Sequence, residues 1–319
     1  MRELIIKKND AGQRLDKFIT KTLDIPMSLL YKSIRLKKIK VNRKRAEAGL
    51  ILSEGDTVQC FLAESFFEKG ETDSSLLRIS PKLSIIYEDE NILLVNKRPG
   101  VSVHEDEHGS QNTLITHILA YLAQKKEYNP VEEQSFTPSL CNRIDRNTGG
   151  IVIAAKNAEA LRVMNEKIKN REIDKFYLAA IHGIPKKSSD TLTGYLLKDE
   201  KTNTVKVFST NPPKNAKNII TKYKVVAKKQ DSALIEVELL TGRTHQIRAH
   251  MAYIGHPLIG DGKYGVNKQD RERGYKYQAL YSYKLRFSFK GEATVLDYLN
   301  GKEFKIDKRD IYFTEEYFS

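Results

Sequence analysis

The sequence has few cysteines and no long apolar run, and each absence excludes a class of protein. Cys60 and Cys141 are too few for a disulfide framework, and without a Cys-x-x-Cys spacing they form no metal-binding pair. No stretch approaches the ~18 apolar residues of a membrane span. The first residues, MRELIIKKNDAG, lack the apolar segment and cleavage site of a secretory signal. We therefore expect a reduced, cytoplasmic protein with no membrane partner.

The composition is that of a globular protein with an excess of positive charge. Of 319 residues, 40% are hydrophobic and 30% are charged, which suits one large domain or two ordinary ones with a sizeable core. Lysine and arginine number 54 against 41 acidic residues, so the net charge is +13. This excess favours an anionic partner, with nucleic acid first. Net charge alone is explained equally well by a solvated lysine-rich surface.

The distribution of the charge is more informative than its total. Residues 31–45 (YKSIRLKKIKVNRKR) contain eight basic side chains and no acid. Residues 201–229 contain eight lysines and again no acid. Two such windows favour contact with phosphate groups, which would supply affinity and salt dependence but no sequence preference.

The first basic window lies in a segment with a regular pattern. An amphipathic helix is expected near Leu15, a second short helix from Pro26 through Leu36, and strands at 39–42 and 53–58. This order, with the motifs RLDKF, KVN and EGD, resembles the S4 RNA-binding domain over about residues 12 to 62. In that family a basic helical face binds the sugar-phosphate backbone of structured RNA. The resemblance therefore implies RNA contacts by Lys37, Lys38, Arg43, Lys44 and Arg45.

The composition changes after this segment. Residues 63–80 turn acidic and rich in Ser and Gly, which is typical of a linker. We therefore expect a small S4-like α/β domain at 1–62, a linker at 63–80, and a larger domain at 81–319.

The larger domain alternates between strand and helix patterns in an order that is not a regular βαβ series. A helix is expected from an N-cap at Asn157 to about Asn170, and strands are expected at 85–87, 92–95, 151–155, 175–181 and 234–240. Residues 281–319, rich in Tyr and Phe, are expected to close the sheet. The predicted fold class is therefore α+β, with a mixed sheet and flanking helices.

Two motif matches conflict with their surroundings. His104-Glu105-Asp106-Glu107-His108 fits the H-E-x-x-H pattern of zinc proteases, but Pro-Gly before it and Gly-Ser after it favour a loop. The segment GDGKYG at 260–265 fits the G-x-G-x-x-G dinucleotide fingerprint, but it lacks the strand and helix that must flank that motif. We expect a loop and a glycine turn, with no metal and no cofactor.

Two polar clusters are the candidates for chemistry. The segment NRIDRNTGG at 142–150 places Asp145 between two arginines, whose charge favours the ionised carboxylate, and ends in paired glycines that allow a tight turn. An ordinary Asp–Arg bridge that orders a loop is the alternative. The segment TGRTHQIRAH at 241–250 follows an alternating strand, at the end of which its side chains would project.

The first of these clusters is similar to the H-R-L-D-x-x-T-S-G signature of the RluA-type RNA pseudouridine synthases. Further motifs of that family occur in order: KRPGVSVH at 97–104, KFYLA at 175–179, LTGRTHQIRAH at 240–250 and GHPLIGDGKYG at 255–265. The resemblance runs from about residue 82 to the high 280s. It implies the pseudouridine synthase fold, in which a largely antiparallel sheet carries flanking helices.

The resemblance also implies roles for individual residues. Asp145 corresponds to the catalytic aspartate, Tyr177 to the active-site tyrosine, and Arg248 to the basic residue paired with that aspartate. Candidate RNA contacts in the same clusters are Arg143, Arg146, Arg243, His245 and Gln246. The chain departs from the family pattern at Asn142, Ile144 and Gly149, none of which is the catalytic aspartate. Asn142, in place of the usual His, is expected to alter how the target loop is held.

The implied reaction is the isomerisation of uridine to pseudouridine in structured RNA, with large-subunit ribosomal RNA (rRNA) as the first candidate. The base is cleaved from ribose C1′, turns, and rejoins through carbon 5, while a carboxylate stabilises or attacks the electron-deficient C1′. The base must leave its stack to be reached. Transfer RNA (tRNA) is the alternative substrate, and a non-catalytic RNA-binding or ribosome-assembly factor is the alternative class. We expect a monomer.

Overall fold

The computed structural model describes residues 1–67, 74–104, 112–265 and 267–318. The chain divides into two compact units. The first is drawn from residues 1–82, 116–139 and 155–162, and the second from residues 83–115, 140–154 and 163–319. Among the described helices, none is both long and apolar enough to cross a lipid bilayer.

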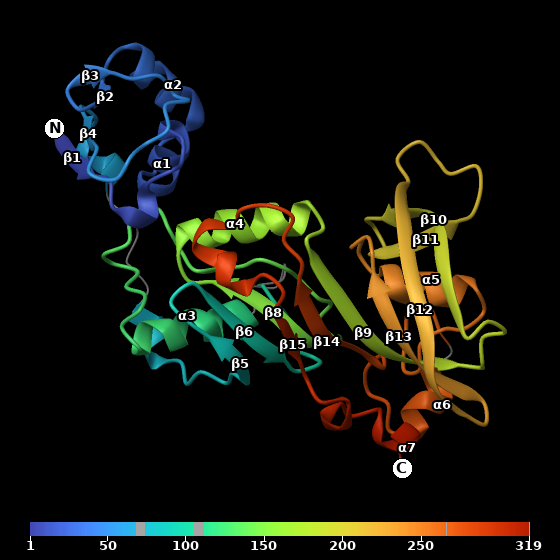
Figure 1. Cartoon of the computed structure of the whole chain (residues 1–319). Coiled ribbons are helices and arrows are strands. Elements are labelled where there is room, and N and C mark those ends of the chain that lie inside the picture. The colour runs from blue at the N-terminus through green and yellow to red at the C-terminus, as the bar shows by residue number, and fades with distance from the viewer. Residues whose placement is uncertain (68–73, 105–111, 266, 319) are drawn as a thin grey trace. The chain divides into compact units, whose positions relative to one another are not determined.

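The N-terminal part of the first unit is a small antiparallel sheet with two helices (Figure 1). The strands follow the order β1-β4-β2-β3, with bounds β1 (Arg2–Ile5), β2 (Ile39–Val41), β3 (Lys44–Arg45) and β4 (Thr57–Cys60). The helices are α1 (Leu15–Thr22) and α2 (Met27–Arg35). The two predicted helices and the strand near residue 39 are confirmed, whereas β1 was not predicted.

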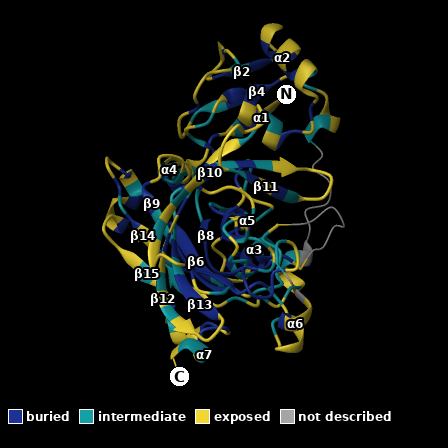
Figure 2. Cartoon of the chain, turned by 90° about the vertical axis from the view of Figure 1, so that its right-hand side faces the viewer, coloured by how far each residue is buried: buried dark blue, intermediate teal, exposed yellow. Residues whose placement is uncertain are grey.

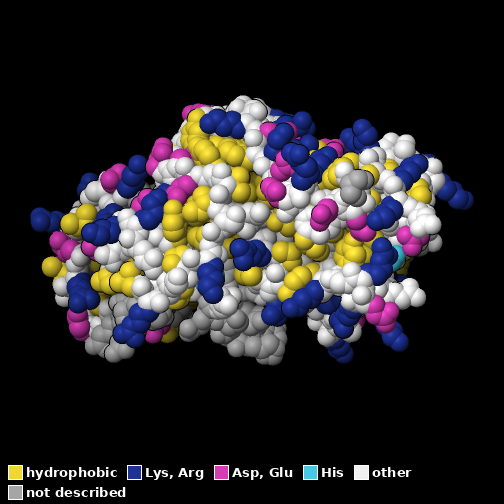
Figure 3. Space-filling model, turned by 90° about the horizontal axis from the view of Figure 1, so that it is seen from below, with side chains coloured by type: hydrophobic (Ala, Val, Ile, Leu, Met, Phe, Trp, Pro, Cys, Tyr) yellow, Lys and Arg dark blue, Asp and Glu magenta, His cyan; other side chains and the backbone are white. Residues whose placement is uncertain are grey.

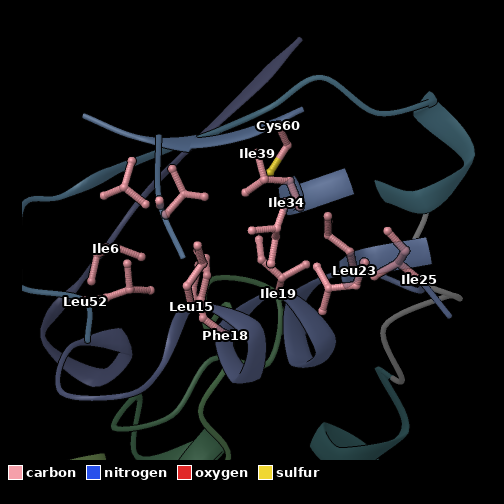
Figure 4. Packing of buried hydrophobic residues seen from close by; sticks show 14 residues of the cluster. Ile6, Leu15, Phe18, Ile19, Leu23, Ile25, Ile34, Ile39, Leu52 and Cys60 are labelled. Atoms are coloured by element: carbon pink, nitrogen blue, oxygen red, sulfur yellow. The ribbon is translucent and has the colours of Figure 1, made fainter. Parts of the chain in front are cut away.

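One apolar cluster holds these elements together (Figure 4). Leu15, Phe18 and Ile19 lie on one face of α1 and pack with Ile34 of α2 and Ile39 of β2, and all of them are buried. Each such side chain contributes about 1.5–3 kcal/mol on burial. The predicted end of the second helix at Leu36 was one residue too long: α2 ends at Arg35, and the Leu36 side chain is 54% exposed.

The first unit also contains segments from later in the chain. It includes two short 3-10 helices, Glu64–Phe67 and Ser74–Arg78, and most of α3 (Leu114–Gln124). The buried carboxylate of Asp10 accepts hydrogen bonds from Ser135 Oγ at 2.6 Å and Gln134 Nε2 at 3.1 Å. A polar contact of this kind joins the 134–135 segment to the N-terminal residues within the same unit.

The second unit is built on a large mixed sheet. Within the described residues it has 11 strands. Nine follow the order β11-β10-β12-β13-β9-β14-β8-β6-β5, and two short strands lie off this path, β7 paired with β8 and β15 paired with β14. The bounds are β5 (Ile85–Glu88), β6 (Ile92–Lys97), β7 (Ser139–Leu140), β8 (Gly149–Ala155), β9 (Ile173–His182), β10 (Ser189–Asp199), β11 (Thr204–Phe208), β12 (Lys217–Lys229), β13 (Ser232–Leu239), β14 (Leu280–Phe287) and β15 (Glu303–Lys305). The strands from β9 to β13 form antiparallel pairs: β9 with β13, β13 with β12, β12 with β10, and β10 with β11. The predicted mixed α+β class is confirmed.

The helices are few and short compared with the sheet. They are α4 (Ala158–Lys169), whose residues up to 162 belong to the first unit, α5 (Gln246–Tyr253), α6 (Asn267–Glu272) and α7 (Glu315–Phe318). The predicted N-cap is confirmed, since Asn157 Oδ1 accepts from the Ala160 backbone N–H at 2.8 Å. Helix α5 packs against β11 and β12 (Figure 1).

At the centre of the sheet, strand β14 from the C-terminal region pairs with strands β8 and β9 from the middle of the chain. β14 lies between β9 and β8 and pairs in parallel with β8, whose residues are all buried (Figure 2). A Cβ on Gly150 would lie 2.1 Å from the Ser282 carbonyl oxygen, and Gly150 has φ of 117°. Only glycine allows the two strands this approach. The 281–319 region therefore contributes a central strand, where we had predicted that it closes the sheet.

Candidate active site

A cavity of about 800 Å³ in the second unit brings together the predicted catalytic residues. Asp145 comes from the loop between β7 and β8, Tyr177 from β9, and Arg248 from α5. The candidate RNA contacts from the two polar clusters also line this cavity: Arg143, Arg146, Arg243, His245 and Gln246. The fold thus gathers residues that are more than a hundred positions apart in the chain.

Arg248 joins two carboxylates. Its Nη1 donates to Oδ2 of Asp145 at 2.9 Å, while its Nε and Nη2 donate to Asp261 at 2.7 and 2.8 Å. Asp261 is fully buried and also accepts from the backbone N–H groups of Lys263 and Tyr264, at 2.9 and 3.3 Å. Because a two-point contact fixes the plane of a guanidinium, Asp261 sets the direction from which Arg248 meets Asp145.

The charges of this group stabilise one another. Burial acts to lower the pKa of Arg248, but its hydrogen bonds and the charges of Asp261 and Asp145 outweigh burial and raise that pKa. Burial acts to raise the pKa of Asp261, and the Arg248 guanidinium holds it below its ordinary value. Arg248 and Asp261 are therefore both ionised at neutral pH.

The Asp145 carboxylate is asymmetric. Its side chain is 28% exposed, and the contact from Arg248 is made to Oδ2. The nearest imidazole atom, Nε2 of His245, also approaches Oδ2, at 3.8 Å. Among the described residues, no donor meets Oδ1, so this oxygen is left for a ligand.

His245 lies beside Asp145 and is oriented by Tyr264. The Val205 backbone N–H donates to the Tyr264 hydroxyl at 2.9 Å, and that hydroxyl lies 2.8 Å from Nδ1 of His245. This contact holds the imidazole plane, and it forms with either ring nitrogen protonated, because a hydroxyl both donates and accepts. Burial lowers the pKa of His245 despite the opposing charge of Asp145. The ring is thus neutral at neutral pH, and its backbone is left-handed, with φ of 54°.

Tyr177 is nearly enclosed, with 6% of its surface exposed. Burial raises the pKa of Tyr177 to about 12, and the charge of Asp145 acts in the same direction. The hydroxyl therefore keeps its proton at neutral pH. It is able to donate a hydrogen bond and is a poor base.

Lys97, at the end of β6, fastens two loops to each other. Its side chain is 1% exposed, and Nζ donates to the carbonyl oxygens of Arg98, Val101 and Arg146 at 3.1, 2.8 and 2.9 Å. The Gly100 backbone N–H donates to the same Arg146 oxygen at 2.9 Å. Burial lowers the pKa of Lys97 to about 7, against the charge of the nearby carboxylate. The 98–101 turn is thereby attached to the residue that follows the predicted catalytic aspartate.

Two residues of the polar clusters serve the scaffold. Gln246 is buried, and its amide accepts from Thr241 and the Arg243 backbone and donates to Ile220 and Thr221. All four hydrogen-bonding positions of the Gln246 amide are therefore used within the protein, where they join the 241–243 turn to β12.

Asn142 is buried too, and its Oδ1 accepts from the Ile153 backbone N–H at 2.8 Å. It stabilises the middle of β8. The expectation that this residue changes how the target loop is held finds no support in its contacts.

The basic windows differ in their surroundings. The residues of the first window that were predicted to contact RNA all lie in the first unit and are all exposed: Lys37, Lys38, Arg43, Lys44 and Arg45. The second window forms β11, β12 and their connection, and it meets acids of β13: Lys222 Nζ donates to Glu238 at 3.0 Å. The second window contains no acid in sequence, but in the folded chain at least one of its lysines is paired with a carboxylate of β13. Lys and Arg side chains are also spread over the face shown in Figure 3.

The two rejected motifs have different outcomes. In the H-E-x-x-H match, residues 105–108 lie outside the described residues, and the described residues contain no group of three or more His, Cys, Asp and Glu suited to a metal. The G-x-G-x-x-G match is confirmed as a turn, and its Asp261 holds Arg248.

Sequence reasoning assigned no role to Asp261, Lys97 or Tyr264. All three lie within motifs that match the family, and their place in these motifs is the one sequence feature that could have indicated a functional role.

Known proteins are similar to this chain in sequence and in fold. The profile of the RNA pseudouridylate synthase family matches residues 91–253. A ribosomal large subunit pseudouridine synthase C of Vibrio parahaemolyticus is 36% identical over 275 residues, which cover 84% of this chain and 82% of that protein. An uncharacterized RNA pseudouridine synthase of Mycoplasma capricolum is 32% identical over 314 residues, covering 95% and 96%.

Among solved structures, human RNA pseudouridylate synthase domain containing 1 is similar in fold. Its TM-score is 0.56 at 23% identity, over 76% of this chain and 86% of that one. Sequence and fold agree, and the chain belongs to the RNA pseudouridylate synthase family.

Proposed function

We propose that this RNA pseudouridine synthase acts on large-subunit rRNA and that Asp145, Tyr177 and Arg248 are its catalytic residues. The proposed substrate rests on the Vibrio relative, which is named for that RNA and resembles this chain over most of its length. One observation carries the catalytic assignment: Oδ2 of Asp145 is engaged by Arg248, while Oδ1 has no donor among the described residues.

The proposed reaction begins at the bond between ribose C1′ and N1 of the uracil. As this bond breaks, both electrons leave with the base and C1′ becomes electron-deficient. Oδ1 of Asp145 stabilises C1′ by charge or by forming a bond to it. Arg248 holds the carboxylate in place through its hydrogen bond to Oδ2.

The base then turns and bonds to C1′ through carbon 5. Carbon 5 loses its proton and N1 gains one, so the product is an isomer of the substrate. Tyr177 is the proposed residue against which the flipped base packs, and its protonated hydroxyl is available for proton transfer. The steps we propose for this chain require only its own side chains.

RNA is bound, in this proposal, by two sets of cations. Exposed arginines at the cavity, Arg143, Arg146 and Arg243, contact the RNA near the target uridine. An S4-like domain at 1–62 contacts the RNA backbone through the exposed residues Lys37, Lys38, Arg43, Lys44 and Arg45. A linker occupies 63–80, and the catalytic domain occupies 81–319. The helix-helix-strand order and the exposed basic surface support the S4 assignment. We propose a cytoplasmic location, where an rRNA substrate would be met.

The test is to map pseudouridine across total RNA from cells with and without the gene. We expect one or more positions in large-subunit rRNA to be modified only when the gene is present. Gene-dependent sites confined to tRNA would contradict the proposed substrate. No gene-dependent site in any RNA would favour a non-catalytic assembly factor.

A further inference from the structure

Lys175 is a charged residue of the cavity that the proposed mechanism does not yet use. It lies on β9 two residues before Tyr177, so both side chains are on one face of the strand, about 7 Å apart along it. Both line the cavity. The residue between them, Phe176, faces the other side, where Lys284 covers its ring at 4.1 Å.

No group of the described chain compensates the Lys175 ammonium. Within the described residues it makes no hydrogen bond and no ion pair, in contrast to Lys97, which donates to three carbonyl oxygens. Burial lowers the pKa of Lys175, with no opposing partner. A desolvated cation without a partner is costly. A bound ligand that carries negative charge would offset this free-energy cost.

The charge balance of the cavity indicates the same kind of ligand. Among its described lining residues, Asp145 is the single carboxylate, against five Lys and Arg side chains. Arg248 is already shared between Asp145 and Asp261. The remaining cations differ in exposure: the arginines at 143, 146 and 243 are exposed, and Lys175 is half-buried on the sheet. Exposed arginines suit phosphates, which remain hydrated, and the half-buried lysine suits the enclosed base.

We propose that Lys175 is a further catalytic residue, whose ammonium contacts a carbonyl oxygen of the target uracil and stabilises the negative charge on the departing base. This inference rests on the proposed function. The uracil is neutral while bonded to C1′ and becomes an anion shared between N1, O2 and O4 when that bond breaks. A cation that meets these oxygens therefore acts more strongly on the transition state than on the bound substrate. Rejoining through carbon 5 removes the charge again.

The experiment compares two leaving groups. Lys175→Met removes the charge at similar length, Lys175→Arg keeps it, and Lys302→Met is the control at an exposed lysine. Single-turnover rates at saturating enzyme are measured on RNA that carries uridine or 5-fluorouridine at the target position. Fluorine stabilises the departing anion, so the enzyme depends less on Lys175 with this substrate. The readout is loss of the original nucleoside after nuclease digestion.

We expect Lys175→Met to lower the rate on uridine on the order of 100-fold, to lower it less on 5-fluorouridine, and to leave the RNA dissociation constant within about twofold. Lys175→Arg should recover part of the loss, and Lys302→Met should match the parent enzyme. Equal losses on both substrates would indicate a merely structural role and overturn the proposal. If Lys175→Met binds RNA more weakly but keeps its rate at saturation, Lys175 is a phosphate contact and the proposal is overturned. An unchanged rate of Lys175→Met on uridine would also overturn it.

Two features keep this test decisive. If Lys175→Met fails to fold in thermal unfolding, Lys175→Gln carries the same comparison. The RNA used is the segment around whichever uridine the mapping identifies. A tRNA target would therefore refute the proposed ribosomal substrate and leave the outcome for Lys175 intact.

Discussion

Arg248 makes two hydrogen bonds to the buried Asp261 and one to Asp145, so the carboxylate that holds the guanidinium is not the one proposed to react. This arrangement separates two tasks. Asp261 bears the cost of anchoring a buried cation, and Asp145 keeps one oxygen that no donor meets in the part of the chain that the structure describes. Loss of Asp261 should therefore damage both the fold and the reaction, whereas loss of Asp145 should damage the reaction alone.

Asp261→Asn is expected to lower the free energy of unfolding by about 3 kcal/mol at neutral pH, because it leaves part of a buried charge uncompensated. The single-turnover rate should fall at least tenfold, since Arg248 loses its fixed orientation. Denaturant unfolding and rate measurements check the two effects. Asp190→Asn, which removes a partly exposed carboxylate paired with Lys187, is the control and should change neither. A stable and fully active Asp261→Asn variant would contradict the anchoring role.

The stability difference should also depend on pH. Because Arg248 holds the pKa of Asp261 below its ordinary value, the pair contributes its full stability above the unfolded-state pKa of about 4. That contribution is lost as the pH falls through the lower, folded-state pKa. The gap between parent and Asp261→Asn should therefore be constant from pH 5 to 8 and shrink below about pH 4.

Asp145→Asn is expected to abolish pseudouridine formation while folding and RNA affinity stay nearly unchanged. The carboxylate is partly exposed, and Arg248 keeps its two bonds to Asp261, so the substitution leaves no unpaired buried charge. Product analysis, thermal unfolding and RNA binding measure the three properties. Unchanged conversion in this variant would refute the proposed mechanism.

The sequence predicted the parts of the site that are marked by local motifs. Asp145, Tyr177 and Arg248 each lie in a short pattern of their own, and the predicted pairing of Arg248 with Asp145 is present. The anchoring role of Asp261 could not be predicted. It depends on α5 meeting a glycine-containing turn 13 residues away along the chain, and no periodic pattern encodes that contact.

The fold shows the same division. Alternating or apolar runs predicted β6, β8, β9 and β13, because these strands bury one face or both. The pattern of a strand does not specify its neighbours. The central place of β14 follows from the close contact at Gly150, which is a relationship between residues far apart in the sequence.

Tyr177→Phe separates two roles left open for this residue. The substitution keeps the ring and removes the hydroxyl, which holds its proton at neutral pH because burial raises its pKa to about 12. If the hydroxyl takes part in proton transfer, the rate at saturation should fall by about 100-fold or more, with unchanged RNA affinity, and this is the outcome we expect. A Phe variant with parental rate, beside an inactive Tyr177→Ala variant, would leave ring packing as the whole role.

Neutralising the exposed basic residues of the N-terminal window tests their contact with RNA. We expect the variant with Gln at Lys37, Lys38, Arg43, Lys44 and Arg45 to bind RNA more weakly and to show a flatter dependence of log K on log salt. Each lost phosphate contact should reduce that slope by about 0.7–0.9. The rate at saturating RNA should stay the same, because these residues are in the first unit and the cavity is in the second.

The control removes the same amount of charge elsewhere, with Gln at the exposed residues Lys268, Lys290, Lys302, Lys305 and Arg309. Equal losses of affinity in both variants would mean that net charge alone attracts the RNA, as an ordinary lysine-rich surface would. A loss confined to the N-terminal variant would assign the binding surface to the residues around α2 and β3. An unchanged affinity and salt slope in that variant would exclude them as RNA contacts, since a phosphate contact cannot be removed without a change in the salt dependence of binding.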